Sequence, residues 1–134
     1  MTSIEEHKKS FTTMIRDIEE KVRSKNEYER QKLIAFAASE ASCDLLAIFL
    51  HNKNLTDPGF NVNHRFFASK KIAESRLEFN FPSKEIIVKL MVEQERYRNL
   101  LCYGKLKEEK HVLKCIENLF TIKKIVEKEC GEIL

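Results

Sequence analysis

The sequence predicts an all-α protein, an antiparallel up-and-down bundle of four long helices plus one short helix. The 134 residues fit one domain, residues 1–134, and include only three glycines and two prolines. Because β-sandwiches and barrels need a turn about every 8–12 residues, a chain this poor in turn formers favours long helices. Apolar residues recur at spacings of three, four and seven, and no stretch alternates as a strand would.

The first helix is expected to begin at Thr2 or Ser3. Ser3 is followed three residues later by Glu6, which is the pattern of a capping box. One apolar stripe follows, made of Ile4, Phe11, Met14, Ile15, Ile18 and Val22. The polar segment RSKNEYER, residues 23–30, indicates a break before the next helix.

The second helix is expected over residues 27–52 and should be the central one. Its many alanines allow neighbouring helices to approach closely. The apolar run LIAFAASEASCDLLAIFL, residues 33–50, is long enough to suggest a membrane span. However, Glu40 and Asp44 lie in its middle, and each would cost about 2.5–3.5 kcal/mol in a bilayer. The run therefore predicts a buried core helix and no membrane partner.

The second half of the chain is expected to contain three more helices. The segment NKNLTDPGFNVN predicts a loop, with Asp57-Pro58-Gly59 as its turn. A short helix should cover residues 64–78 and end before Pro82. Ser83 is placed to cap the fourth helix, and Gly104 stands where a C-terminal glycine belongs. The fifth helix is expected over residues 107–128.

Composition excludes several classes of function. The net charge is +3, which permits a nucleic-acid partner without requiring one. Four isolated cysteines and four scattered histidines form no metal-binding spacing, so no metal or cofactor is expected. His7 and His111 are expected on solvated, charged faces. The start, MTSIEEHKKS, is too polar for a signal peptide, and the reduced cysteines suit a cytoplasmic protein.

Arg98 is the residue whose position most needs explaining. It lies in the segment ERYRNLLCYGK, residues 95–105, at the edge of the apolar stripe of the fourth helix. An arginine there requires an acidic partner or a ligand. Glu95, one turn earlier, or Glu40, from the second helix, could form a structural ion pair with it. The alternative is a contact with phosphate or RNA.

Tyr103 follows Arg98 by five residues, so on a regular helix the two side chains point about 140° apart. They converge only if the helix loosens near Gly104 or if a second protomer brings its own copy. Basic residues form two further groups, which could make a positive groove or could be ordinary solvated charge: His64, Arg65, Lys70, Lys71 and Arg76, and Arg96, Lys105, Lys107 and Lys110.

The motif RNLLCYG resembles that of the HEPN domains (higher eukaryotes and prokaryotes nucleotide-binding). Many members carry arginine, often followed by Asn, Asp or His, and a histidine four to six residues further on. One branch, found in archaea and bacteria, has arginine, four residues and Tyr-Gly instead, which Arg98, Tyr103 and Gly104 match. ASEASCDLLAIFL and NVNHRFF are similar to that branch's second helix and to the entry to its third element.

The resemblance implies a small helical bundle that binds RNA or a nucleotide, often as a homodimer. Many HEPN proteins are metal-independent ribonucleases of toxin–antitoxin pairs, with a small nucleotidyltransferase as partner. By resemblance, Arg98 and Tyr103 are the candidate catalytic residues. The candidate phosphate-binding residues are Arg98, Asn99, Lys105, His64 and Arg65. A tyrosine ordinarily has a pKa of about 10, so at the histidine position it is a poor general base and favours binding over catalysis.

A function of another class is compatible with the same residues. The chain could be a non-catalytic protein-interaction module, such as an antitoxin-like or scaffold partner. It could also be an accessory subunit of a small nucleotidyltransferase. The substitution Arg98→Ala separates these hypotheses, because only binding of RNA or a nucleotide requires the guanidinium to contact phosphate.

Overall fold

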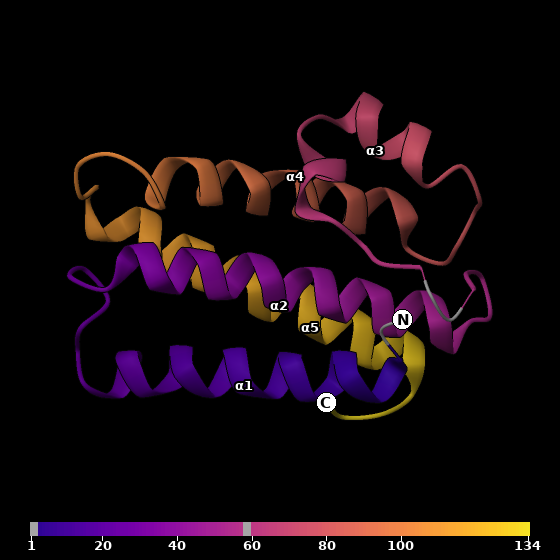
Figure 1. Ribbon diagram of the computed structural model, residues 1–134, viewed down its shortest axis with the longest axis horizontal. Helices are drawn as coiled ribbons and strands as arrows, with labels where there is room; N and C mark the ends of the chain where they lie inside the picture. Colours follow the sequence, from indigo (N-terminus) through magenta and orange to yellow (C-terminus); the bar gives the residue numbers. More distant parts are fainter. Residues whose placement is uncertain (1–2, 58–59) are drawn as a thin grey trace.

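The computed structural model describes residues 3–57 and 60–134, and every regular element in those ranges is helical. The elements are α1 (Ile4–Arg23), α2 (Gln31–Asn52), the 3₁₀ helix η1 (His64–Phe67), α3 (Lys70–Arg76), α4 (Lys84–Leu101) and α5 (Glu109–Cys130). Four of them are long and extend along the long axis of the molecule, while α3 lies beside one end of α4 (Figure 1). The predicted all-α class is confirmed.

Helix α2 is the centre of the packing. It contacts α1, α4 and α5, whereas α1 packs mainly against α2. Helices α4 and α5 also pack against each other, and η1 and α3 cover the first half of α4. This arrangement of contacts is consistent with the four-helix antiparallel bundle that the sequence predicts.

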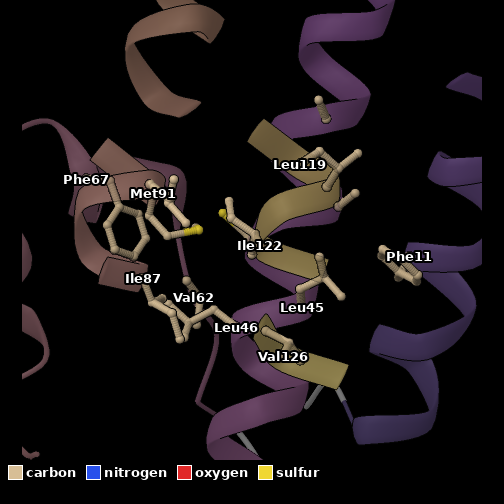
Figure 2. Packing of buried hydrophobic residues seen from close by; sticks show 14 of the residues in the cluster. Phe11, Leu45, Leu46, Val62, Phe67, Ile87, Met91, Leu119, Ile122 and Val126 are labelled. Atoms are coloured by element: carbon tan, nitrogen blue, oxygen red, sulfur yellow. The ribbon is translucent and has the colours of Figure 1, made fainter. Parts of the chain in front are cut away.

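The hydrophobic core forms around α2 because that helix is apolar on nearly all sides. Leu45, Leu46 and Ile48 are fully buried, and Ala38 and Ala41 are fully buried as well. Burying each large aliphatic side chain is worth about 1.5–3 kcal/mol. Figure 2 shows this core, with side chains of α2, α4 and α5 packed together and Phe11 of α1 on one side.

Among the described residues, α2 is the one helix long and apolar enough to cross a membrane. However, 83% of its most apolar window is buried inside the protein, as in the core helix of a soluble domain. The expectation of a core helix is therefore confirmed, while the cytoplasmic location stays a prediction.

Helix ends agree with the sequence in part. Ser3 and Glu6 form the expected capping box, and Thr2 lies outside the described residues. Helix α2 begins at Gln31, four residues later than expected, because residues 26–30 form a turn.

The single helix expected over residues 64–78 is divided into two helices, η1 and α3. Ser69 has an extended backbone and its side chain accepts a hydrogen bond from the amide of Ile72, so a new helix starts there.

The cap of α4 differs from the prediction. Ser83 stands at the N-cap position, but its side chain makes no capping hydrogen bond; its hydroxyl instead donates to Glu129 of α5, at 3.4 Å. Its φ of 63° is left-handed. At the other end, Gly104 has a φ of 76°, which favours glycine, although α4 already ends at Leu101. The expected turn at Asp57 involves Pro58 and Gly59, which lie outside the described residues.

His7 was expected in solvent, and this expectation is wrong. The residue is only 6% exposed, and its Nδ1 lies 2.8 Å from Oδ1 of Asp44 on α2. The physical reason is its register on α1: position 7 precedes Phe11 by one turn, so it continues the apolar stripe onto α2. His111 is half-buried rather than fully solvated.

Candidate functional site

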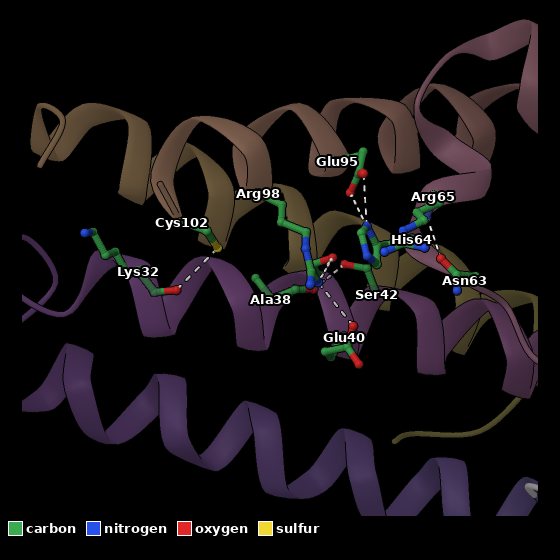
Figure 3. Close-up of polar contacts among 11 residues, drawn as sticks. Lys32, Ala38, Glu40, Ser42, Asn63, His64, Arg65, Glu95, Arg98 and Cys102 are labelled. Atoms are coloured by element: carbon green, nitrogen blue, oxygen red, sulfur yellow. Dashed lines mark hydrogen bonds and ion pairs between the residues drawn. The ribbon is translucent and has the colours of Figure 1, made fainter. Parts of the chain in front are cut away.

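Arg98 lies in the seam between α2 and α4, where its guanidinium points to α2 and pairs with Glu40 (Figure 3). Nη1 donates to Oγ of Ser39 at 3.1 Å and to Oε2 of Glu40 at 3.2 Å. The guanidinium carbon also lies 5.1 Å from the ring centre of Phe36, a cation–π contact. Of the two acidic partners considered from the sequence, Glu40 is therefore the one that pairs with Arg98.

The ion pair uses only one nitrogen of the guanidinium. Nε and Nη2 of Arg98 have no hydrogen-bond partner within the described residues. Nor do they belong to the buried unpaired atoms found there, which are all in His7, Asp44 and His51. These two nitrogens therefore keep some contact with solvent, on a side chain that is 12% exposed. They form the edge of the guanidinium that binds a carboxylate or phosphate with two parallel hydrogen bonds.

Glu95 takes a different partner, and this brings His64 to the seam. Nδ1 of His64 lies 2.9 and 3.0 Å from the two carboxylate oxygens of Glu95, so it donates to that carboxylate. Helix η1 positions His64, because Asn63 precedes it and accepts a hydrogen bond from the amide of Arg65 at 2.8 Å. No described residue is bonded to Nε2 of His64, whose side chain is 23% exposed.

His64 is bonded to Glu95, and Glu95 lies about one turn before Arg98 on α4, so the two basic side chains lie near each other (Figure 3). We call this group the Arg98 seam: Ser39, Glu40, His64, Glu95 and Arg98. Each of its two basic side chains is oriented by one nitrogen and offers another to a ligand. The sequence showed both residues but not their proximity.

Beneath the Arg98 seam the side chains are closely packed, and the polar ones are hydrogen-bonded to each other. Cys43 is buried there, and burial raises the pKa of its thiol well above its usual range. The space enclosed between it, His64 and Glu95 is too small for a water molecule. Next to it, Gln94 donates to Ser42 at 3.2 Å and accepts from Asn118 at 2.9 Å, which links α2, α4 and α5. A ligand can therefore bind on this seam but not beneath it.

The remaining candidate residues lie apart from Arg98. Tyr103 is 63% exposed in the loop after α4, and Asn99, Lys105 and Arg65 are exposed. Within the described chain, no hydrogen bond connects any of them to the guanidinium. The backbone carbonyls of Tyr103 and Lys105 both accept hydrogen bonds from Nζ of Lys107, at 3.2 and 2.6 Å. The loop is ordered by that lysine rather than by the seam.

Of the two basic groups noted in the sequence, one member each lines a shared groove among the described residues. Lys70 and Arg96 line a groove of about 650 Å³ on another side of α4, together with Lys89. Glu85 and Glu93 line the same groove, so its charge is mixed. Lys105 and Lys110 lie at the opposite end of α4, in or near the loop to α5.

No metal centre is evident in residues 3–57 and 60–134. No group of three or more His, Cys, Asp or Glu side chains there could hold a metal ion. All four cysteines are free thiols; Cys43 and Cys115 are buried, and Cys102 and Cys130 are half-buried.

Comparison of the chain with models of protein families, with curated proteins and with solved structures gives no match. The resemblance to HEPN domains therefore rests on the motif around Arg98 and stays a prediction.

Proposed function

We propose that the protein is a HEPN-like bundle of antiparallel helices that binds RNA or a nucleotide phosphate through the Arg98 seam. One observation carries the proposal: Nε and Nη2 of Arg98 keep some contact with solvent while Nη1 is held by Ser39 and Glu40. A guanidinium whose orientation is already determined loses less freedom when it binds, which favours affinity. Its unused edge matches the geometry of two phosphate oxygens.

His64 supplies a second contact in this proposal. Its Nδ1 donates to Glu95, which leaves Nε2 to accept a hydrogen bond from a ribose hydroxyl next to the phosphate. Phe36 is 44% exposed beside the guanidinium and offers a ring face for a base. Arg65, Asn99 and Lys105 are exposed and would add contacts further along a strand.

Ribonuclease activity of the toxin type is a further step in this proposal, and it depends on His64. Cleavage without a metal requires a group that takes a proton from the ribose 2′-hydroxyl. An imidazole titrates close to neutral pH and suits this role, whereas a tyrosine does not. No hydrogen bond joins Tyr103 to Arg98 among the described residues. We therefore expect any cleavage to require His64 and to tolerate Tyr103→Phe.

A homodimer is the proposed assembly. Leu33, about one turn before Phe36 on α2, is 51% exposed, and Tyr103 and Leu106 are exposed at the end of α4. A second copy that covers these apolar groups would bring two seams close together. The same exposed surface favours the second candidate function, a protein-interaction module or an accessory partner of a small nucleotidyltransferase. Sedimentation of the purified chain separates the two: a monomer favours a different partner.

The decisive experiment compares two arginines of α4. Arg98→Ala should weaken binding to a mixed RNA pool at least tenfold, because it removes the oriented guanidinium. Arg96→Ala is the matched control: it removes the same charge two residues away, from an exposed side chain that lines the other groove. Thermal melting shows whether each variant is folded. Equal affinities for the two folded variants would contradict the proposal.

Salt dependence provides an independent measurement on the same proteins. Phosphate contacts release counterions, so the affinity of the wild type for RNA should fall steeply as salt rises. Folded Arg98→Ala should show a shallower slope than Arg96→Ala. If the folded wild type binds no RNA at low salt, the interaction module becomes the better reading.

A further inference from the structure

Glu40 is the one seam residue that faces Arg98 with an opposing charge and also reaches solvent. Its side chain is 39% exposed, against 12% for Arg98. We propose that Glu40 acts as a charge filter, which favours singly charged phosphodiesters over doubly charged phosphate monoesters. This inference rests on the proposed phosphate-binding function and names the ligand charge that the same site accepts.

The charges of the Arg98 seam are unusual for a phosphate site. One permanent cation, Arg98, stands beside two carboxylates, Glu40 and Glu95. Among the described residues, the ion pairs of Glu40 and Glu95 are with Arg98 and His64 alone. Two basic side chains face two carboxylates, so the seam carries no excess positive charge. Each further negative charge on a ligand is repelled by the carboxylate of Glu40.

Glu40 lies close enough to act on a ligand directly. The nearest oxygen of a phosphate on Nε and Nη2 of Arg98 would be about 6 Å from Oε2 of Glu40, given ordinary hydrogen-bond lengths on both edges of one guanidinium. This separation is shorter than the Debye length of about 8 Å at physiological ionic strength, so salt does not remove the repulsion. A phosphodiester brings one negative charge, whereas a monoester carries close to two at pH 7.5.

The second carboxylate does not replace Glu40 in this role. The side chain of Glu95 is only 8% exposed, and both of its oxygens accept from Nδ1 of His64. The hydrogen bond from His64 therefore already stabilises the negative charge of Glu95. Glu40 has Arg98 as its sole hydrogen-bond partner within the described chain, so removal of its charge changes the seam most.

The test uses two ligands that differ by one methyl group on the phosphate, which removes one negative charge: AMP and the methyl ester of its phosphate. Each competes with a labelled RNA oligomer at pH 7.5. The wild type should bind the methyl ester about fivefold more tightly than AMP, the size of an exposed charge–charge interaction. Glu40→Gln should bring this ratio close to one by improving the binding of AMP. Glu19→Gln, which removes an exposed charge on α1, should leave the ratio unchanged.

The outcomes distinguish the proposed role of Glu40 from the proposed phosphate binding by Arg98. If Glu40→Gln keeps the wild-type ratio while Arg98→Ala weakens both ligands, the filter is wrong and phosphate binding stands. If folded Arg98→Ala binds both ligands as the wild type does, the proposed function itself fails. Glu40→Ser carries the same expectation and provides the readout if the glutamine variant does not fold. A wild type that binds AMP as tightly as the ester also overturns the filter.

Discussion

At the scale of single residues, the most unusual feature is a buried polar cluster between α1 and α2. Asp44 is 9% exposed and receives a hydrogen bond from His7, whose ring stacks on that of His51 with 6.0 Å between the ring centres. Oδ2 of Asp44 and Nε2 of both histidines are buried without a partner among the described groups. Buried polar atoms normally find a partner, so this cluster costs stability.

Asp44→Asn tests the electrostatic part of this cost. Burial raises the pKa of Asp44 above its ordinary value of 3.8, so the folded state favours the protonated carboxyl. The protonated carboxyl of Asp44 therefore contributes its full stability below pH 3.8, and this contribution is lost as the pH rises through the raised pKa. Asparagine is neutral at every pH, and its side-chain oxygen still accepts from His7. The variant should therefore gain stability relative to the wild type between pH 4 and pH 7.

Denaturant unfolding at the two pH values measures this gain. The difference between the variant and the wild type cancels the other carboxylates, which titrate in both proteins. A difference that does not change between pH 4 and pH 7 would show that Asp44 is not penalised by burial.

At the scale of elements, Gln31 connects the two loops at one end of the molecule. It is the first residue of α2 and is fully buried. Its side-chain oxygen accepts from the amide of Lys107 at 2.6 Å, and its Nε2 donates to the carbonyl of Lys107 at 3.0 Å. Nε2 also donates to the carbonyl of Tyr28 at 2.8 Å. One side chain thus holds the loop that carries Tyr103 against the start of α2.

Gln31→Leu should reduce the free energy of unfolding by about 1–3 kcal/mol, since it leaves the polar backbone groups of Lys107 unpaired. The amide of Lys107 should also lose its protection from hydrogen exchange. Lys32→Leu, at the exposed neighbouring position, is the control and should change neither quantity appreciably. Unchanged exchange at Lys107 in folded Gln31→Leu would refute this role for Gln31.

At the scale of the whole molecule, stability depends on how closely the other helices approach α2. Ala38 and Ala41 are fully buried in its middle, and α2 packs against α1, α4 and α5. Small side chains at these positions are what permit contact on several sides. A larger side chain there must push a neighbouring helix away.

Ala41→Leu should therefore destabilise the protein by about 1–3 kcal/mol, the usual cost of overpacking a core. Ala68→Leu places the same side chain at an exposed position between η1 and α3, where it should have little effect. Chemical denaturation of both variants measures the difference. Equal stabilities would mean that α2 is less tightly enclosed than its burial indicates.

The sequence alone determined the features that depend on local spacing and composition. The scarcity of glycine and proline and the three- and four-residue spacing of apolar side chains were enough for the all-α class and for α2 as the buried helix. The capping box at Ser3 is also local, and it formed. His7 shows the limit, because a polar residue in line with an apolar stripe was still expected in solvent.

Only the tertiary structure decided which side chains meet at the Arg98 seam. From the sequence, Glu95 and Glu40 were both possible partners for Arg98, and His64 had no assigned position. In the fold, Arg98 pairs with Glu40, which is 58 positions away, and Glu95 pairs with His64, which is 31 positions away. Pairing over such separations depends on how α2, η1 and α4 are placed by their shared core, and no local pattern of residues encodes that placement.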